Sequence, residues 1–393
     1  HKVLIPMKEN YLLLYKTFFR KQINTFISFI LFLLSIFIIF INLKKIFNKD
    51  IIIIQNQRLG FGNTFTSIDL ARKIFKNKKI LFINFYDSSR FHNPKLFDFL
   101  NEEKIILYMS IYFKKRKSRF GEFDVYPKKN ENYFQNILIK IILIIANKRT
   151  NSYDILALYQ LASNKNKLLK KKKYNFISPY HQWVNYYYHL VEKDRTLKLN
   201  KKNSLLKKFI KSKDSKIICF YIREKKLINK VTQNHNLYFK LINFFFKNNY
   251  HIFLTGEYIN LLKAYPEILK LVKLPEIRGH FDKEKNLAMQ LSSNYYIGDA
   301  GGGSYFAMYK KKSIILGDHV GNFFPKNVKT FKYNLYKDNL KIQINKKYKK
   351  FFNKKIKFYK TSLDPFLLIK LGFHIRSYSQ KSVLNYVLNN FKK

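Results

Sequence analysis

Short, fully apolar runs alternate along the chain with longer stretches in which apolar residues recur at helical spacing. Residues 50–55 contain four consecutive isoleucines, and a run of this kind is typical of a parallel strand that helices cover on both faces. Similar runs predict further strands at 79–84, 103–108, 216–222, 251–254, 276–279, 295–297, 313–316 and within 327–345. The alternation of strands and helices predicts an α/β fold with parallel sheets.

The predicted helices lie between these strands, at 65–75, 136–146, 151–169, 180–191, 237–248, 259–271, 287–292, 305–309 and 377–391. The stretch 192–214 is rich in lysine and lacks periodic apolar positions, so it is the predicted boundary between two domains. Each half has the rhythm of a Rossmann-like domain. The predicted domains are 50–195 and 215–345, followed by a basic patch and a C-terminal helix in 346–393.

A basic segment, residues 1–22, precedes a mostly apolar stretch at 23–43. A helix of about twenty apolar residues spans the hydrocarbon core of a bilayer, so the sequence predicts a single transmembrane anchor. Basic residues flank both ends equally and do not decide the orientation. One cysteine and the lack of any Asn-x-Ser/Thr sequon favour a protein body on the cytoplasmic face of the membrane.

A glycine-rich turn follows the predicted strand 295–297. Its residues are Gly298, Asp299, Gly301, Gly302, Gly303 and Ser304. Glycines let the backbone approach an anion, and the start of the following helix offers unpaired N–H groups, with Ser304 as the predicted N-cap. The pattern predicts a phosphate-binding turn, although a strand-to-helix turn that binds nothing can have the same sequence.

Two further polar segments follow strands of the first half. A second glycine turn consists of Gly60, Gly62 and Asn63. A polar loop after the strand 79–84 carries Asp87 and His92, at the sheet edge where open α/β proteins bind ligands. Asp69, by contrast, lies inside the first predicted helix, and we assign it a structural role.

Composition narrows the class of partner. The formal net charge is +52, and lysine supplies most of it together with abundant Ile, Asn, Phe and Tyr, a set that an AT-rich genome produces. The charge therefore does not by itself indicate nucleic-acid binding, but it favours anionic partners such as nucleotides, acidic lipids and acidic glycans. Cys219 is the only cysteine, which excludes an internal disulfide and a multi-cysteine zinc site. With neither a DxD-type cluster nor His/Cys ligand spacing, we expect no bound metal.

Three short motifs resemble those of GT-B nucleotide-sugar glycosyltransferases. In fucosyltransferase-like enzymes a His-x-Arg segment ends a strand; here Arg223 matches the arginine and Tyr221 replaces the histidine. The 60–63 turn resembles the Gly-x-Gly-Asn loop of the same families, and the 298–304 turn resembles the donor-phosphate loop of bacterial heptosyltransferases. The order of elements over about residues 50–345 is also similar to that of uncharacterised bacterial glycosyltransferase-like proteins.

The resemblance implies two Rossmann-like domains of GT-B type, the first for the acceptor and the second for the donor nucleotide. It implies transfer of a hexosyl or deoxyhexosyl group from a nucleotide sugar to a cell-surface glycan or lipid-linked acceptor, without metal or cofactor. In this scheme Arg223 holds the donor diphosphate, and Asp299, Asp318 or His319 positions ribose or sugar hydroxyls. The resemblance also places the final helix, 377–391, against the first domain.

An inverting transferase of this class needs a general base for the acceptor hydroxyl. The candidates are Asp87 and His92, although most polar loop residues are only solvated turns. For Arg223 the alternative is a surface ion pair with Glu224 or Glu257.

Two other functions stay open. One is a dinucleotide-dependent oxidoreductase, but the 60–62 turn lacks the third glycine of G-x-G-x-x-G, and Asn84 stands where an acidic residue is expected unless Asp87 serves. The other is a non-catalytic basic protein that binds nucleic acid or a membrane surface. That function predicts lysines gathered on one face, whereas here they are scattered along the whole chain.

Overall fold

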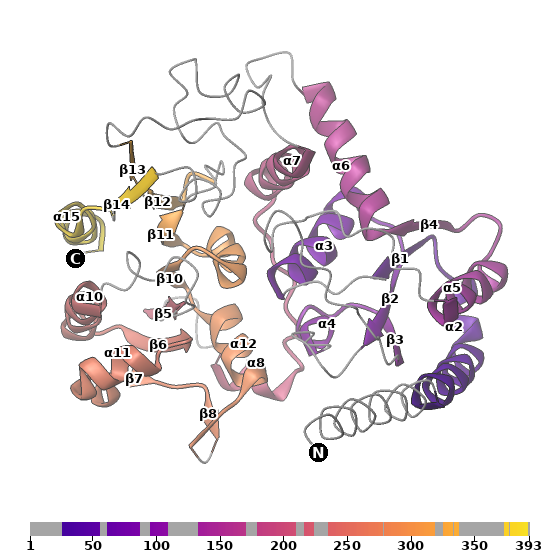
Figure 1. Cartoon of the computed structure of the whole chain (residues 1–393), viewed down its shortest axis with the longest axis horizontal. Coiled ribbons are helices and arrows are strands. Elements are labelled where there is room, and N and C mark those ends of the chain that lie inside the picture. Colours follow the sequence, from indigo (N-terminus) through magenta and orange to yellow (C-terminus); the bar gives the residue numbers. More distant parts are fainter. Residues whose placement is uncertain are drawn as a thin grey trace, which may run out of the picture.

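The computed structural model describes most of the chain. The described residues are 26–55, 61–86, 95–108, 133–169, 179–209, 216–223, 235–277, 279–318, 325–332, 334–337, 373–376 and 378–391. They form two separate parallel sheets with helices around them (Figure 1). The predicted α/β class with parallel sheets is confirmed.

The first sheet has four parallel strands in the order β3-β2-β1-β4. These strands are β1 (Ile51–Gln55), β2 (Ile80–Tyr86), β3 (Lys104–Tyr108) and β4 (Asn151–Asp154). The helices of this half are α2 (Leu43–Phe47), α3 (Phe61–Ile74), α4 (Lys95–Phe99), α5 (Tyr133–Ile145), α6 (Ile155–Leu169) and α7 (Pro179–Lys193).

The prediction of one helix over 151–169 was wrong at its start. The first four residues form β4, which pairs with β1 at the edge of the sheet, and α6 begins only at Ile155. No apolar run marks β4, because an edge strand that is largely exposed need not carry one.

The second sheet has six parallel strands in the order β12-β11-β10-β5-β6-β7. These strands are β5 (Ile217–Ile222), β6 (His251–Gly256), β7 (Val272–Lys273), β10 (Tyr295–Asp299), β11 (Lys312–Asp318) and β12 (Val328–Lys332). If the six strands are numbered in chain order within this half, the sheet order is 3-2-1-4-5-6, which is that of a dinucleotide-binding domain. From β5 the chain adds strands on one side, and from β10 it adds them on the other, so the direction of winding reverses between β5 and β10. Open α/β sheets bind ligands beyond the carboxyl ends of the two strands at such a reversal.

The helices of the second half are α8 (Ser204–Phe209), α10 (His235–Lys247), α11 (Ile259–Ala264), η2 (Pro266–Lys270), α12 (Lys283–Ser292), η3 (Gly302–Tyr309) and α15 (Gln380–Phe391). Two small antiparallel pairs are also present: the hairpin of β8 (Glu276–Ile277) with β9 (His280–Phe281), and the pair of β13 (Asn334–Lys337) with β14 (Phe373–Arg376). The single helix predicted over 259–271 is divided, because Pro266 lacks the N–H that a continuous helix requires.

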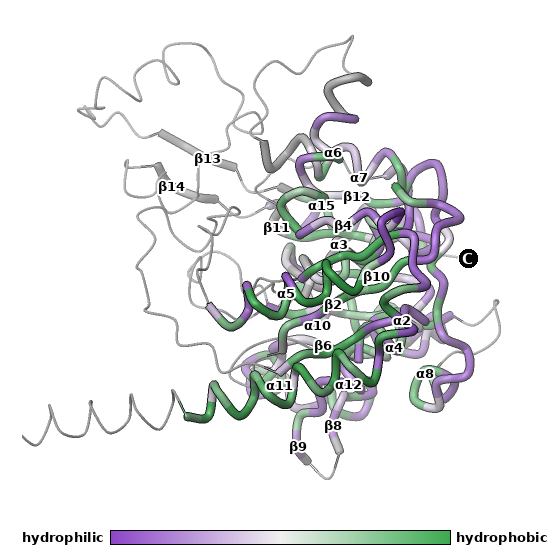
Figure 2. The backbone as a smooth tube through the Cα atoms, turned by 90° about the vertical axis from the view of Figure 1, so that its right-hand side faces the viewer, coloured by the Kyte–Doolittle hydropathy of each residue, from purple (hydrophilic) through white to green (hydrophobic). Residues whose placement is uncertain are grey.

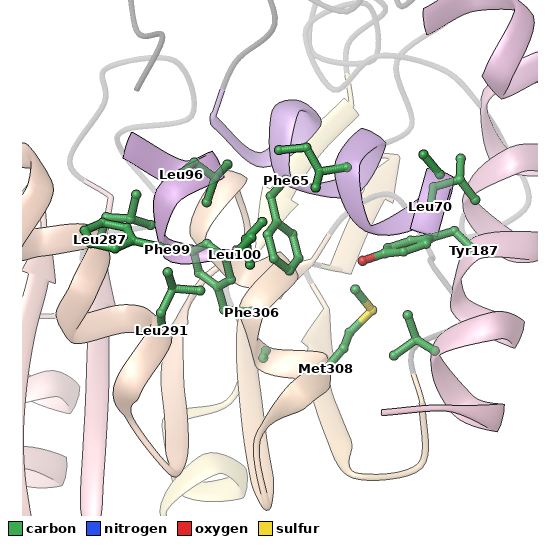
Figure 3. Packing of buried hydrophobic residues seen from close by; sticks show 14 of the residues in the cluster. Phe65, Leu70, Leu96, Phe99, Leu100, Tyr187, Leu287, Leu291, Phe306 and Met308 are labelled. Atoms are coloured by element: carbon green, nitrogen blue, oxygen red, sulfur yellow. The ribbon is translucent and has the colours of Figure 1, made fainter. Parts of the chain in front are cut away.

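One apolar core serves both sheets. In β1, Ile51 and Ile53 face this core, whereas Ile52 and Ile54 face a smaller cluster that also holds α5. The shared core also contains β5, α3, α7, α12 and η3 (Figure 3). The predicted domain limits stay a prediction, but the two sheets lie on either side of one continuous hydrophobic cluster.

The expectation that the final helix packs against the first domain was wrong. Phe391 at the end of α15 contacts Phe245 of α10 and Tyr295 of β10, with ring centroids 5.3 and 5.9 Å apart. Lys312 also donates a hydrogen bond to the Asn390 carbonyl at 2.8 Å. The apolar side chains of α15 therefore complete the outer face of the second sheet.

Residues 26–41 form a helix along the edge of the first half (Figure 2). Ser35 donates to the Tyr108 carbonyl at 2.9 Å, and Phe32 packs on Phe134 of α5 at 4.8 Å. Ile39 on the same side is buried, whereas nine apolar side chains of the helix are more than a third exposed: Phe26, Ile27, Phe29, Ile30, Leu33, Leu34, Phe37, Phe40 and Ile41. Within the described part of the chain, no helix combines the length and apolar character needed to cross a membrane.

Candidate functional site

The carboxyl ends of β5 and β10 meet at the point where the winding of the second sheet reverses. Arg223 directly follows β5, and Asp299 is the last residue of β10. The Arg223 backbone N–H donates to Asp299 Oδ2 at 2.8 Å, and its Nη1 donates to the Ala300 carbonyl at 3.2 Å. A Cβ atom on Gly301 would lie 3.3 Å from Arg223 Cδ and Nη1. The predicted proximity of Arg223 to the glycine turn is therefore present.

Asp299 holds the shape of this turn. Its side chain is buried, with Oδ1 accepting from the Tyr238 hydroxyl at 2.8 Å and Oδ2 accepting from the Arg223 backbone. Burial raises the pKa of the Tyr238 hydroxyl, so Tyr238 stays a neutral donor to the carboxylate. Asp299 thus ties α10 and the end of β5 to β10, and its role toward ribose or sugar hydroxyls stays a prediction.

Two glycines make room for the Tyr221 side chain beneath the turn. A Cβ on Gly298 would lie 2.5 Å from the Tyr221 carbonyl oxygen, and one on Gly303 would lie 2.7 Å from the Tyr221 ring. Arg223 comes two residues after Tyr221, just beyond the end of β5, and its side chain lies against Gly301 of the same turn. Tyr221 therefore supports the glycine turn.

The prediction of Ser304 as the N-cap of the next helix was wrong. The helix η3 begins earlier, at Gly302, with Gly301 as its N-cap. Ser304 lies inside the first turn, where its hydroxyl donates to the Gly301 carbonyl at 2.6 Å. Glycine is needed here for space, because a Cβ on Gly301 would lie 3.3 Å from Arg223 and one on Gly303 would lie 2.7 Å from the Tyr221 ring. The N–H groups of the triplet consequently lie at the positively polarised end of η3.

The second glycine turn occupies the matching place in the first sheet. The helix α3 begins at Phe61, four residues earlier than predicted, so Gly62 and Asn63 belong to its first turn. Phe65 of α3 contacts Phe306 of η3, with ring centroids 4.6 Å apart (Figure 3). Further along both helices, Asp69 accepts a hydrogen bond from the Tyr309 hydroxyl. Phe65 and Asp69 of α3 thus contact Phe306 and Tyr309 of η3 in the same chain order. The two helices therefore run in the same direction, and their amino ends lie at the same end of the pair.

Two buried amides lie at the carboxyl edge of the first sheet, and sequence reasoning did not assign them a function. Gln55 is the last residue of β1, its register partner Asn84 lies two residues before the end of β2, and both are fully buried. Gln55 Nε2 donates to Ser67 Oγ at 2.8 Å, whereas Gln55 Oε1 and the Oδ1 and Nδ2 atoms of Asn84 have no hydrogen-bond partner among the described residues. The sequence signal that could have identified them is a polar residue at the end of each predicted apolar strand, Gln55 in 50–55 and Asn84 in 79–84.

The remaining predicted site residues lie outside the described part of the chain or have only their backbone described. Gly60, Asp87, His92 and His319 lie outside the described residues. For Asn63, Gly302 and Asp318 only the backbone is described; Asp318 ends β11, the neighbour of β10. Their roles stay predictions. In the described ranges, no group of His, Cys, Asp and Glu side chains is arranged to hold a metal ion.

Comparison with known proteins finds similarity in solved structures only. No family model matches the chain, and no curated protein matches it. The E. coli heptosyltransferase WaaC, solved with ADP-2-deoxy-2-fluoro heptose, is 9% identical over 71% of this chain and 92% of its own, with a TM-score of 0.38. A glycosyl transferase family 9 protein from Veillonella parvula is 13% identical over 73% and 86%, with a TM-score of 0.41. HepE from Anabaena, solved with UDP and glucose, is 11% identical over 71% and 86%, with a TM-score of 0.28. The first two are glycosyltransferases, the class that the sequence motifs predict.

Proposed function

We propose that this chain is a glycosyltransferase that moves a sugar from a nucleotide-sugar donor to a glycan or lipid-linked acceptor. The observation that carries the proposal is the guanidinium of Arg223 lying against the Gly301 turn at the reversal point of the second sheet. A nucleoside diphosphate needs cationic donors and a positive electrostatic potential, and both are gathered here.

The chemistry we propose is stabilisation of the leaving diphosphate without a metal ion. A guanidinium has five N–H donors, and the Arg223 side chain uses Nη1 for the Ala300 carbonyl, so further donors can reach phosphate oxygens. The amino end of η3 adds a positive potential at the same place. In this proposal the first half holds the acceptor, and Asp87 or His92 removes the proton from its hydroxyl.

Replacing Arg223 by alanine tests the donor site. A charge-assisted hydrogen bond contributes about 1.5–3 kcal/mol, so we expect the affinity for the donor nucleotide to fall about ten- to a hundredfold. Calorimetric titration of ADP, UDP, GDP and CDP sugars would measure it, with Arg223→Lys as the charge-conserving control. An unchanged affinity in Arg223→Ala would contradict the assignment. Binding of a nicotinamide dinucleotide without any sugar nucleotide would favour an oxidoreductase instead.

We propose in addition that the segment 23–43 attaches the protein to a membrane, with the body on the cytoplasmic face. The exposed apolar side chains of residues 26–41 support this, because patches of this kind on soluble proteins mark contact surfaces. Replacing Phe29, Leu33 and Phe37 together by glutamine is expected to move the protein from the membrane pellet to the supernatant at high salt. The buried side of the helix, including Ile39, is untouched in this variant. If it still sediments with membranes, the attachment lies elsewhere.

A further inference from the structure

A buried carboxylate connects the two halves of the molecule next to the glycine turn. Asp69 lies on α3 of the first half and is almost completely buried. Its Oδ2 atom accepts hydrogen bonds from two hydroxyls, that of Tyr187 on α7 at 3.0 Å and that of Tyr309 on η3. Lys73, one turn further along α3, lies 3.9 Å from the same oxygen. A buried charge is costly unless it is paired in this way, so these contacts specify one arrangement of three helices.

Tyr309 is the last residue of η3, the helix whose first residues carry the glycine triplet. The next residue, Lys310, is buried, and its Nζ donates to the carbonyls of Gln290, Leu291 and Ser293 at 2.7, 3.0 and 2.8 Å. The far end of η3 is therefore held at two adjacent points, by α3 of the first half and by α12 of the second. Because η3 is only eight residues long, fixing its last residue also fixes the position of its first residues.

We propose that Asp69 is a positioning residue for the donor site: through Tyr309 it orients η3, and so sets the glycine turn beside Arg223. This inference rests on the proposed function, because the turn is taken as the diphosphate site. Asp69 itself lies too deep in the shared core to touch a ligand. It acts by aligning η3 with α3, so that the amino ends of both helices face one ligand.

The structure offers a matched pair of variants. Tyr187→Phe and Tyr309→Phe each remove one buried hydroxyl from the same Asp69 oxygen, and each keeps its aromatic ring. Only Tyr309→Phe removes the hydrogen bond from η3 to Asp69; Tyr187→Phe removes the longer contact of 3.4 Å between the two hydroxyls. If Asp69 only stabilises packing, the two variants should lower the nucleotide affinity equally. If Asp69 positions η3, Tyr309→Phe should lower it more than Tyr187→Phe.

The experiment measures the affinity of both variants for ADP, UDP, GDP and CDP, alongside their melting temperatures. We expect Tyr309→Phe to weaken binding of the preferred nucleotide about tenfold, and Tyr187→Phe by no more than about twofold, at similar losses of thermal stability. Asp69→Leu should resemble Tyr309→Phe, and Asp69→Asn, which keeps an acceptor oxygen, should recover part of the affinity. Equal affinities in the two tyrosine variants would overturn the proposal.

Hydrogen exchange of the ligand-free protein separates this inference from the proposed function. We expect the amides of residues 301–304 to exchange faster in Tyr309→Phe than in Tyr187→Phe or the parent protein. If the parent binds no nucleotide, the proposed function fails, and this exchange pattern still decides whether Asp69 orients the turn. Identical exchange in all three proteins would refute the positioning role.

Discussion

Replacing Gly298 by alanine is expected to lower the free energy of unfolding by about 3 kcal/mol or more. The added Cβ would lie 2.5 Å from the Tyr221 carbonyl oxygen, 2.8 Å from its Cβ and 3.0 Å from its Cα. These atoms belong mainly to the backbone of β5, the hydrogen-bonded neighbour of β10, so no side-chain rotation can relieve the clash. The two strands must separate, and the Arg223 site at their ends is distorted with them.

Denaturant titration followed by circular dichroism would measure this loss. Gly279→Ala is the control, because no atom lies within 4 Å of the added methyl group; its φ of +78° still makes alanine unfavourable there by about 1 kcal/mol. The single tryptophan, Trp183, stacks on Tyr159 at 4.0 Å in the first half and gives a second signal by fluorescence. A Gly298→Ala variant as stable as the Gly279→Ala variant would show that the strands are not so closely packed.

Replacing Lys310 by methionine is the second change with a large expected effect. Methionine fills a similar volume but removes the Lys310 donor from three carbonyls at the end of α12, of which that of Gln290 still accepts from Ser293 Oγ at 3.1 Å. Each unsatisfied buried carbonyl costs about 1–3 kcal/mol, partly offset because a buried charge is also removed. We expect a net loss of about 2–3 kcal/mol at neutral pH, measured by denaturant titration. Lys311→Met, at the exposed neighbouring position, should change stability by no more than about 0.5 kcal/mol.

The stability difference between the parent and Lys310→Met should grow with pH. Burial lowers the pKa of Lys310 from 10.5 to about 7. Between these values the unfolded chain binds a proton that the native protein lacks, so the parent gains stability as pH rises from about 7 toward 10. Below the folded pKa both states are protonated and the contribution is constant. The methionine variant lacks this titration, and a difference that shrinks between pH 7 and pH 9 would contradict the burial of a lysine here.

The elements that carry the candidate site were predictable from local patterns. Apolar runs located β5 and β10, and the carboxyl ends of parallel strands lie at one edge of a sheet. This rule was enough to predict that Arg223 lies beside the glycine turn. Local patterns did not locate the start of η3, because its N-cap is Gly301, which has no side chain to act as a cap.

The contacts between the two halves were not predictable. Asp69 and Tyr309 are 240 residues apart, and neither a polar residue in a helix nor a tyrosine after a glycine turn indicates its partner. The helix 377–391 shows the same limit: its apolar face predicted a helix but not which sheet it covers. β4 was missed because a polar edge strand has no apolar signature.

The shared core has a consequence for how the chain is synthesised. Phe65 and Tyr187 emerge from the ribosome with the first half, but their partners Phe306 and Tyr309 follow more than a hundred residues later. Tyr309 follows Tyr187 by 122 residues, so at about 5–20 residues per second the inner face of the first half stays exposed for roughly 6–24 seconds. During that interval the nascent chain is a substrate for chaperones that hold apolar surfaces, and neither half can reach its native state before the ribosome has passed residue 309.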